Sequence, residues 1–356
     1  MNKDSKIYVA GHRGLVGSAI FANLKKRGYS NVVGRTHSQL DLLDSAAVKA
    51  FFDEEKPEYV VLAAAHVGGI MANSIYRADF IYQNLQIQQN VIGESFRHGV
   101  KKLLFLGSTC IYPREAPQPI PESALLTSPL EYTNEPYAIA KIAGMKMCES
   151  FNLQYGTDYI AVMPTNLYGP GDNFNLETSH VLPAMIRKIH LAKALNEGNM
   201  DAVRRDLDRR PVENVDGKAD IEAIAAILAK YGIFADHLDL WGTGSPLREF
   251  LWSEDMADAS VYIMENISFK DLRGNGKEVR NCHINIGSGK EISIRETAEK
   301  IKGAIGYKGE IHWDGTKPDG TMRKLCDVSK LHSLGWKHKI ELDEGIARLY
   351  RWYLDN

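Results

Sequence analysis

Short apolar runs alternate with longer segments of helical periodicity through the first half of the chain. The apolar runs lie at Ile7–Ala10, Asn31–Val33, Tyr59–Ala65, Lys102–Leu106 and Tyr159–Met163. The segments of helical periodicity lie at Val16–Arg27, Ser45–Glu55, Phe80–His98 and about Asn134–Tyr155. Continuous apolar strands that alternate with helices are typical of a parallel sheet covered on both faces. The pattern therefore predicts an α/β fold with a doubly wound parallel sheet.

The pattern is less regular after about Pro164. We expect helices over His180–Leu195, Ile221–Lys230 and Leu342–Tyr353, and short strands near Cys282–Ile286 and Glu310–Trp313. A highly charged stretch, Asn196–Asp220, separates the first two of these helices. We predict a first domain over residues 1–165 and a smaller, mixed α/β lobe over 166–356, with some later segments returning to the first domain.

The composition narrows the class of protein. The chain has 356 residues, 44% of them hydrophobic, and a formal net charge of −2, so it lacks the basic field that draws proteins to nucleic acid or membranes. No apolar run approaches the roughly 18 residues of a membrane helix, and the polar start lacks a secretory pattern. The four cysteines, Cys110, Cys148, Cys282 and Cys326, form no C-x-x-C pair. We expect a soluble cytoplasmic protein with reduced thiols, no metal, and no nucleic-acid or membrane partner.

A glycine-rich sequence follows the first predicted strand. Residues 11–17 read GHRGLVG, a G-x-x-G-x-x-G pattern directly before a helix. A tight turn favours a residue without Cβ, and a pyrophosphate needs close approach to the N–H groups at a helix N-terminus. The third glycine, Gly17, allows the helix to pack close to the strand. This context predicts a dinucleotide site in a Rossmann-type domain.

The end of the second predicted strand bears on the choice of cofactor. An acidic residue there would bind the ribose 2′-hydroxyl of NAD, but the chain reads Val33-Gly34-Arg35. Arg35 is a suitable partner for the 2′-phosphate of NADP, and Arg13 could join it. Asp41 follows the next turn and is placed near the adenine. We therefore predict NADP(H) as the cofactor.

Three residues with catalytic chemistry lie on the next predicted strand end and helix. Ser108 comes directly after a predicted strand, and Tyr137 and Lys141 form a Y-x-x-x-K pair one helical turn apart. A lysine beside a phenol favours the phenolate, so we expect Lys141 to lower the pKa of Tyr137. Tyr137 could then exchange a proton with a substrate oxygen that Ser108 also binds. Lys141 could in addition hold the nicotinamide ribose.

The order of these motifs resembles the extended short-chain dehydrogenase/reductase family, and within it the enzymes that epimerise and reduce GDP-4-keto-6-deoxy-D-mannose. The similarity extends over nearly the whole chain. It is carried by GHRGLVGSAI (11–20), AAAHVGGI (63–70), FIYQN (80–84), LLFLGSTCIYP (103–113), NEPYAIAKIAGMK (134–146), MPTNLYGPGDNF (163–174), SHVLPA (179–184), REF (248–250) and KPDGTMRK (317–324).

The resemblance implies an activity that forms GDP-L-fucose. Protons would be exchanged at C3 and C5 of the sugar, and NADPH would then reduce the C4 ketone. Both carbons are α to the carbonyl, so each proton removal gives an enolate that Ser108 and Tyr137 could stabilise. By resemblance, Cys110 is the base and His180 is the acid. We expect Cys110 to lie on the same side of an extended strand as Ser108, two residues earlier.

The resemblance also implies further site residues. The expected cofactor-binding residues are Gly11, His12, Arg13, Gly14, Leu15, Val16, Gly17, Arg35, Asp41, Ala64, Leu106, Gly107, Tyr137, Lys141, Pro164, Asn166, Leu167 and His180. The expected substrate-binding residues are Asn166, Lys188, Trp241, Arg248 and Asp319. Cys148, Cys282 and Cys326 match no functional position and are taken as structural. A homodimer is expected through the long helices at 80–98 and 134–155.

The chain departs from the family pattern at two places. His37 stands where the family often has a second arginine, which weakens the expected NADP preference. The stretch over about 195–240 is longer than the family's connection. One interpretation is a surface excursion with one docked helix. The other is a lid or a subunit contact, which the apolar face of Ile221, Ile224, Ala225 and Leu228 would suit.

Two other functions remain open from the sequence. A related nucleotide-sugar 4-epimerase/reductase would share most motifs, whereas a 4,6-dehydratase would usually carry an Asp-Glu pair where this chain has Thr109-Cys110. A non-catalytic nucleotide-sensing protein would keep the fold but would have no need for the Ser108, Tyr137 and Lys141 set.

Overall fold

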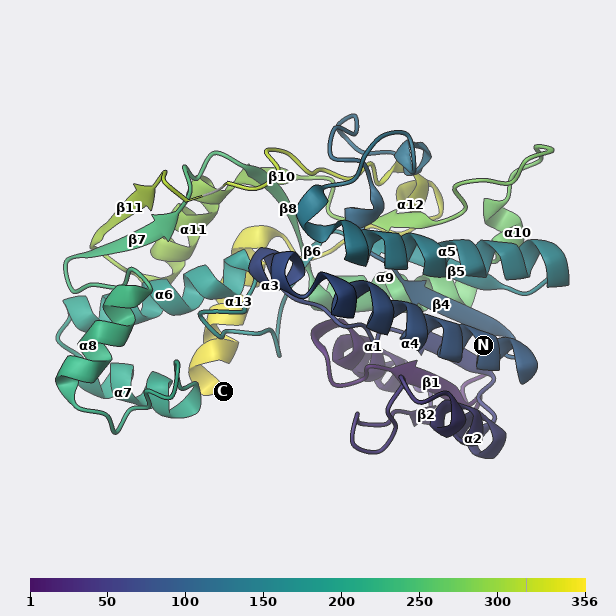
Figure 1. Ribbon diagram of the computed structural model, residues 1–356, viewed down its shortest axis with the longest axis horizontal. Helices are drawn as coiled ribbons and strands as arrows, with labels where there is room; N and C mark the ends of the chain where they lie inside the picture. Colours follow the sequence, from purple (N-terminus) through teal and green to yellow (C-terminus); the bar gives the residue numbers. More distant parts are fainter. Residues whose placement is uncertain (318) are drawn as a thin grey trace. The chain divides into compact units, whose positions relative to one another are not determined.

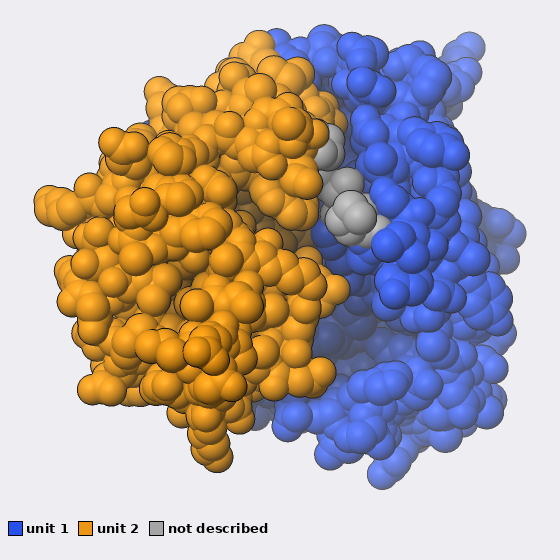
Figure 2. Space-filling model, turned by 60° about the vertical axis from the view of Figure 1, so that its left-hand side comes forward, with its two compact units in different colours: residues 1–169, 249–290, 324–340 blue, residues 170–248, 291–323, 341–356 orange. Residues whose placement is uncertain are grey.

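The computed structural model describes residues 1–317 and 319–356. Pro318, which belongs to the segment KPDGTMRK, lies outside the described residues. The chain divides into two compact units, coloured blue and orange in Figure 2. Unit 1 comprises residues 1–169, 249–290 and 324–340, and unit 2 comprises residues 170–248, 291–323 and 341–356. The sequence placed the domain boundary at residue 165 and left unspecified which later segments return to the first domain; unit 1 ends its first segment at Gly169 and includes 249–290 and 324–340.

Unit 1 is built on a six-stranded sheet in which all neighbouring strands are parallel (Figure 1). In spatial order the strands are β2 (Val32–Val33), β1 (Ile7–Ala10), β3 (Tyr59–Leu62), β4 (Lys102–Leu106), β5 (Tyr159–Pro164) and β9 (Ile284–Ile286). The chain leaves β1 for β2 on one side and then crosses to β3 on the other side. The end of β1 is therefore the topological switch point, where open α/β sheets bind their ligands.

Successive residues of β1 pack into different apolar layers, as the alternation of a strand requires. Ile7 and Val9 belong to the layer that also contains residues of α1 and α9. Tyr8 and Ala10 belong to the layer that contains residues of α2, α4 and α5. The helices of unit 1 are α1 (Leu15–Lys26), α2 (Ser45–Glu55), α3 (Ile70–Ile75), α4 (Arg77–Arg97), α5 (Glu135–Tyr155), α9 (Ser253–Asn266), α10 (Phe269–Leu272) and α12 (Ser329–Ser333), with 3-10 turns η1 (Thr109–Ile111), η2 (Glu122–Ala124) and η3 (Tyr132–Asn134). The predicted doubly wound parallel sheet is confirmed.

Unit 2 is a mixed α/β unit. Its elements are α6 (Val181–Asn196), α7 (Met200–Arg209), α8 (Ile221–Lys230), β7 (His237–Trp241), β10 (Glu291–Ser293), α11 (Ile294–Ile305), β11 (Glu310–Asp314) and α13 (Leu342–Asp355). Strands β7 and β11 pair in parallel, and α6 packs against α7, α11 and β7. Strand β8 (Leu247–Trp252) begins in unit 2 and ends in unit 1, where it pairs with β6 (Asn166–Tyr168).

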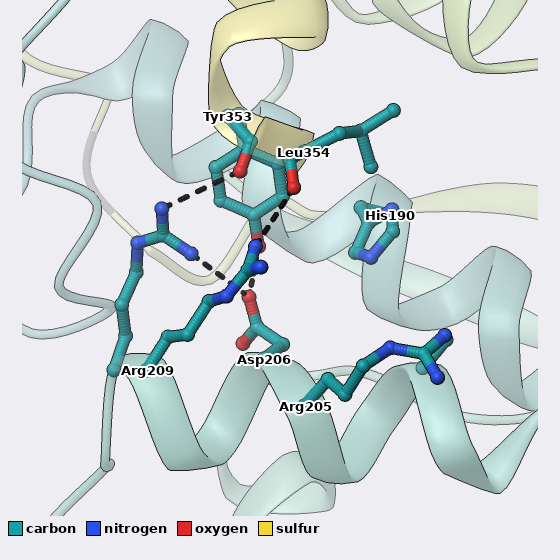
Figure 3. Close-up of a pocket in the computed structure, with 8 residues that line it drawn as sticks. His190, Arg205, Asp206, Arg209, Tyr353 and Leu354 are labelled. Atoms are coloured by element: carbon teal, nitrogen blue, oxygen red, sulfur yellow. Dashed lines mark hydrogen bonds and ion pairs between the residues drawn. The ribbon is translucent and has the colours of Figure 1, made fainter. Parts of the chain in front are cut away.

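The charged stretch 196–220 contains a helix that the sequence analysis did not assign. Helix α7 buries Val203 and Leu207, and its Asp206 forms an ion pair of 2.8 Å with Arg187 of α6, a side chain that is fully buried. Asp206 also accepts a hydrogen bond from the hydroxyl of Tyr353 in α13. Asp206 and Tyr353 line a pocket that Figure 3 shows. The volume of this pocket is about 160 Å³. The long stretch is thus docked on α6 and α13 within unit 2.

Helix α8 is amphipathic as predicted. Ile224, Ile227 and Leu228 are buried, whereas Ile221 is 57% exposed and Ala225 is exposed. Of the apolar face suggested for a lid or subunit contact, Ile224 and Leu228 are therefore already covered, and Ile221 and Ala225 are open to solvent. The role of the 195–240 stretch as a lid or subunit contact stays a prediction.

Within the described parts of the chain, none of the helices has the length and apolar character that a membrane crossing requires.

The ion pair between Arg187 and Asp206 generates a stability prediction. Replacing Arg187 by Met leaves Asp206 as a buried carboxylate without its main partner, which should lower the free energy of unfolding by about 3–5 kcal/mol. Urea unfolding followed by circular dichroism would measure the change. Arg209→Met is the matched control, because Arg209 is exposed and donates only to the carbonyl of Leu354 among the described residues. An equal decrease in the free energy of unfolding in both variants would show that the buried ion pair does not stabilise the protein.

Candidate active site

The glycine loop after β1 has the close approaches that a dinucleotide site needs. Gly11 has φ +83°, and a Cβ there would lie 2.7 Å from the backbone nitrogen of Ala64 at the end of β3. A Cβ on Gly17 would lie 2.1 Å from the carbonyl oxygen of Gly11. Both positions therefore exclude any side chain, and they bring the loop, the end of β3 and the first turn of α1 together.

Helix α1 begins at Leu15 with Gly14 as its N-cap, and no side chain caps it. Its first turn contains no acidic residue. The free N–H groups and the positive end of the helix dipole therefore suit an anionic group such as a pyrophosphate. Arg13 is exposed and makes no hydrogen bond or ion pair with the described residues, so its charge is available to such a group.

Arg35 lies after β2, as predicted, but it is already paired. Its guanidinium forms an ion pair with Glu55 of α2, donates 3.0 Å to the carbonyl of Gly34, and lies over the ring of Phe51. Glu55 also pairs with Lys6 at 2.9 Å, which leaves part of the positive charge uncompensated. Asp41 accepts a hydrogen bond from the backbone of Leu43.

Ser108 and Cys110 are brought together by a turn, which corrects the expected extended strand. Strand β4 ends at Leu106, and Thr109–Ile111 form the 3-10 turn η1. Ser108 caps this turn, since its Oγ accepts a hydrogen bond of 3.2 Å from the backbone N–H of Cys110. The prediction that the two side chains share one side of a strand was wrong, because the strand stops before both of them.

Lys141 is held below the strand end by α5. Its side chain is 3% exposed, and its ammonium donates a hydrogen bond of 2.8 Å to the carbonyl of Leu106. Burial lowers the pKa of Lys141 to about 8. Its Nζ lies 5.8 Å from the ring centre of Tyr137, one helical turn away.

The pKa of Tyr137 is raised, whereas the sequence analysis expected it to be lowered. Burial raises the pKa of Tyr137, a negative charge on Cys110 raises it further, and a hydrogen bond with Ser108 lowers it without reversing the shift. The prediction that Lys141 lowers this pKa was wrong, since the ammonium is directed to the carbonyl of Leu106 instead of the phenol oxygen. The phenol of Tyr137 therefore stays protonated and can act as a proton donor.

Cys110 has a cationic neighbour that the sequence analysis did not identify. The Nζ of Lys324 donates a hydrogen bond of 3.4 Å to the sulfur of Cys110. Burial raises the pKa of the thiol, but the charge of Lys324 and hydrogen bonds with Ser108 and Lys324 outweigh it, so the pKa is lowered overall. A thiol with a lowered pKa is a nucleophile or a base near neutral pH.

The backbone after Lys324 is fixed by buried polar contacts. Leu325 donates 2.8 Å to the side chain of Gln118, and Cys326 donates 2.9 Å to the carboxylate of Glu249. Glu249 is fully buried and also accepts a hydrogen bond from Gly289. Lys324 and Glu249 lie in the segments KPDGTMRK and REF, so the sequence did carry a signal at both positions, but only the fold reveals their partners.

The remaining predicted residues of unit 1 line the carboxyl ends of its strands. Gly107 donates 2.8 Å to the carbonyl of Val162, and a Cβ there would meet the sulfur of Met163. Pro164 ends β5, and Leu167 lies in β6 beside Asn166, whose amide donates 2.8 Å to the carbonyl of Glu249. The other cysteines, Cys148, Cys282 and Cys326, are free thiols, and burial raises the pKa of each.

Unit 2 holds the other predicted side chains. His180 is exposed and caps the N-terminus of α6 through its backbone. Lys188, on the same helix, is buried without a hydrogen-bond or ion-pair partner among the described residues, and burial lowers its pKa to about 8 despite the charge of Asp239. A buried, unpaired ammonium is suited to an anionic ligand.

Trp241, Arg248 and Asp319 differ in how free their side chains are. Trp241 ends β7 and is 60% exposed, so its ring offers a flat apolar surface. Arg248 donates to the carbonyl of Leu247, which leaves guanidinium donors for a ligand. Asp319 accepts hydrogen bonds of 2.7 and 2.8 Å from the backbone and hydroxyl of Thr243, so it shapes the turn after β7.

Comparisons with known proteins identify the family of this chain. The family model described as "NAD dependent epimerase/dehydratase family" matches residues 7–207 and 212–287. GDP-L-fucose synthase 1 of Arabidopsis thaliana is 53% identical over 355 residues, covering 100% of this chain and 95% of that protein. GDP-L-fucose synthase of Escherichia coli (strain K12) is 48% identical over 351 residues, covering 99% of this chain and 97% of that protein.

Solved structures of high similarity come from Campylobacter jejuni. A GDP-6-OMe-4-keto-L-xylo-heptose reductase has 48% identity and a TM-score of 0.94, with 100% of this chain and 99% of that chain covered. MlghC, a GDP-mannoheptose C4 reductase with NADP bound, has 47% identity and a TM-score of 0.88, with 99% of each chain covered. From the strand-end motifs and these matches together, the chain belongs to the NAD-dependent epimerase/dehydratase family.

Proposed function

We propose that this protein converts GDP-4-keto-6-deoxy-D-mannose to GDP-L-fucose by epimerisation at C3 and C5 and NADPH-dependent reduction of the C4 ketone. The observation that carries the proposal is that a proton donor, Tyr137, and an activated thiol, Cys110, both hydrogen-bond with Ser108. A plain ketoreductase needs the donor but has no use for the thiol. The relatives named GDP-L-fucose synthase support the choice of substrate.

The residues present fit NADP(H). The close approach of Gly11 and Gly17 and the uncapped start of α1 suit its pyrophosphate, and Arg13 and Arg35 suit its 2′-phosphate. When bound, NADPH supplies the hydride that reduces the C4 ketone. The buried ammonium of Lys141 donates a hydrogen bond to the carbonyl of Leu106. Lys141 also holds the nicotinamide ribose beside Tyr137.

Epimerisation begins with removal of a proton from a carbon next to the C4 ketone. Cys110, whose thiol pKa is lowered by Lys324, accepts this proton at its sulfur when it is ionised. The electron pair moves onto the C4 oxygen, where Ser108 and Tyr137 stabilise the enolate by hydrogen bonds. By resemblance, His180 returns a proton to the carbon on the face opposite the base. Cys110 then releases its proton to solvent and His180 takes one up, after which the same steps at the other carbon complete the double inversion.

Reduction uses the protonated form of Tyr137. Because burial and the charge on Cys110 raise its pKa, the phenol holds a proton that it donates to the C4 oxygen as the ketone becomes an alcohol. Lys188 and Arg248 neutralise the diphosphate of the substrate, Trp241 packs against an apolar face of it, and Asp319 fixes the turn beside Trp241.

A reductase of GDP-4-keto-heptoses is the second candidate. It is favoured by the Campylobacter jejuni reductases, whose identities of 47–48% equal those of some relatives named for fucose synthesis. The two substrates share the GDP group and the C4 ketone, so Ser108, Tyr137 and Lys141 would serve both. The substituent at C5 of the sugar distinguishes them.

The proposal also covers the oligomeric state of the protein and its location in the cell. We infer a cytoplasmic homodimer formed through α4 and α5, which pack against each other in unit 1. These helices leave large apolar side chains exposed: Tyr82 at 67%, Leu153 at 52% and Tyr155 at 53%. Exposed apolar groups on neighbouring helices are typical of a subunit contact. All four cysteines are free thiols, in keeping with a reducing compartment.

The function is tested by measuring NADPH oxidation with GDP-4-keto-6-deoxy-D-mannose in D₂O, followed by mass analysis of the product. The proposal expects NADPH consumption and two deuterium atoms on carbon. Cys110→Ser should keep cofactor binding and lose deuterium incorporation by about 10²–10⁴-fold in rate. Consumption without deuterium in the wild type would contradict the epimerase role. Turnover of a GDP-4-keto-heptose alone would favour the second candidate.

Removing the phenol oxygen of Tyr137 should lower kcat without loss of ligand. Tyr137→Phe is expected to reduce NADPH oxidation by about 10²–10⁴-fold, because the proton donor is gone. NADPH binding, measured by fluorescence titration, should remain within a few-fold of wild type. Tyr132→Phe is the matched control, since Tyr132 is 71% exposed. Wild-type turnover in Tyr137→Phe would remove this residue from the mechanism.

The charge of Lys324 should set the pH dependence of Cys110. Lys324 lowers the pKa of the thiol, so Lys324→Met should raise that pKa and move the rate profile of iodoacetamide alkylation to higher pH. Deuterium exchange at carbon should shift in the same direction. Lys339→Met, at an exposed ion pair with Asp258, should leave both profiles in place. An unmoved alkylation profile in Lys324→Met would refute the assigned cause.

A further inference from the structure

Unit 2 carries a group of potential metal ligands that includes Asp239, the carboxylate whose charge acts on Lys188. His237 and Asp239 lie two positions apart on β7 and so point to the same face of the strand. His312 of β11 is the register partner of Asp239 in the parallel pairing of the two strands. One nitrogen of each histidine and an oxygen of Asp239 all lie within 4.8 Å of one another. Two strands far apart in the sequence thus supply one cluster.

The facing atoms are spaced nearly as metal ligands are. The Nε2 of His237 lies 3.7 Å, and the Nδ1 of His312 lies 3.6 Å, from the same oxygen, Oδ1 of Asp239. In a tetrahedral zinc site, bonds of about 2.0–2.2 Å hold nitrogen and oxygen ligands roughly 3.4 Å apart. The two imidazole rings are stacked, with centroids 4.7 Å apart and an interplanar angle of 27°, so binding requires the rings to rotate until both lone pairs point at one ion.

A second carboxylate holds each imidazole from its other side. Asp236 lies 2.7 Å from the Nδ1 of His237, and Glu310 lies 3.2 Å from the Nε2 of His312. A carboxylate in this position keeps the proton on the outer nitrogen and leaves the lone pair of the inner nitrogen free for a metal. Each imidazole thus contacts two carboxylates, whereas a chance ion pair of a surface histidine needs only one.

The charge of the cluster also favours a cation. Three carboxylates, those of Asp236, Asp239 and Glu310, converge on the two imidazoles. In the described part of the chain, no lysine or arginine forms an ion pair with any of the three. A pair of imidazoles with a carboxylate matches the ligand preference of zinc, nickel and cobalt better than that of magnesium or calcium.

We propose that unit 2 binds one divalent transition ion of the zinc class through His237, Asp239 and His312, with water in the fourth position. The ion joins β7 to β11, whose pairing is the contact that orders the strand leading to Trp241. The sequence analysis predicted no metal because it considered the cysteines, while these ligands lie on two distant segments.

The test uses the untagged, EDTA-treated full chain, titrated with ZnCl₂ by calorimetry and with CoCl₂ by visible absorption. We expect one equivalent of Zn²⁺ with a dissociation constant in the micromolar range or below, a raised Tm, and the strong absorption of tetrahedral Co²⁺. His237→Ala and His312→Ala should abolish this binding. Glu310→Gln should weaken it by about 10–100-fold, since it loosens a ligand without removing it.

Two controls separate this site from adventitious binding. His37→Ala removes an exposed histidine that lies 3.8 Å from a single carboxylate, Asp41, and it should bind Zn²⁺ as the wild type does. Cys110→Ser should also bind normally, which excludes the activated thiol as the ligand. The proposal is overturned if the wild type binds no Zn²⁺ below millimolar concentration, or if His237→Ala and His312→Ala bind it unchanged. These results are independent of the proposed reaction.

Discussion

Parallel strand pairing is the constraint on which unit 1 depends. Because all strands of the sheet run in one direction, the carboxyl ends of β1, β3, β4 and β5 meet at a single edge. Apart from Lys324, which lies where the chain re-enters this unit, the functional groups assigned to the unit are attached to that edge or to a helix that follows it. The same pairing forces each connection to cross a face of the sheet, so both faces must be apolar. The core and the site are thus two consequences of one hydrogen-bonding pattern.

At this edge, charged groups are held where water is largely excluded. Lys141 satisfies its ammonium with the carbonyl of Leu106, and Lys324 satisfies its own with the sulfur of Cys110. Each arrangement fixes the direction in which a charge acts, and low dielectric strengthens its effect on neighbouring groups. Lys324 lowers the pKa of the Cys110 thiol, the group proposed to remove protons from carbon. Lys141 instead holds the backbone that precedes Ser108. The two lysines are therefore not equivalent, although both lie beside the same turn.

Much of the fold followed from periodicity. The strands β1 and β4 and the helices α2 and α8 have the predicted bounds. Contiguous apolar residues mark the two strands, and apolar residues three or four positions apart mark the two helices. Helix α7 was missed because it is charged on most of its surface and gains its stability from Arg187, a residue outside it. The motifs predicted Ser108, Tyr137 and Lys141 as a group, but not their geometry. The turn η1, the direction of the Lys141 ammonium, and the contact of Lys324 with Cys110 depend on residues that only the folded chain brings together.

The mutual influence of Cys110 and Tyr137 has a consequence for the order of events. A negative charge on the sulfur raises the pKa of the phenol, so the two groups disfavour simultaneous ionisation. The pKa of each group therefore depends on the charge of the other. While the sulfur is ionised, the raised pKa of the phenol favours its protonated form. In the proposed reaction, the state of the pair that can remove a proton from carbon therefore also retains the phenol proton that the reduction later needs.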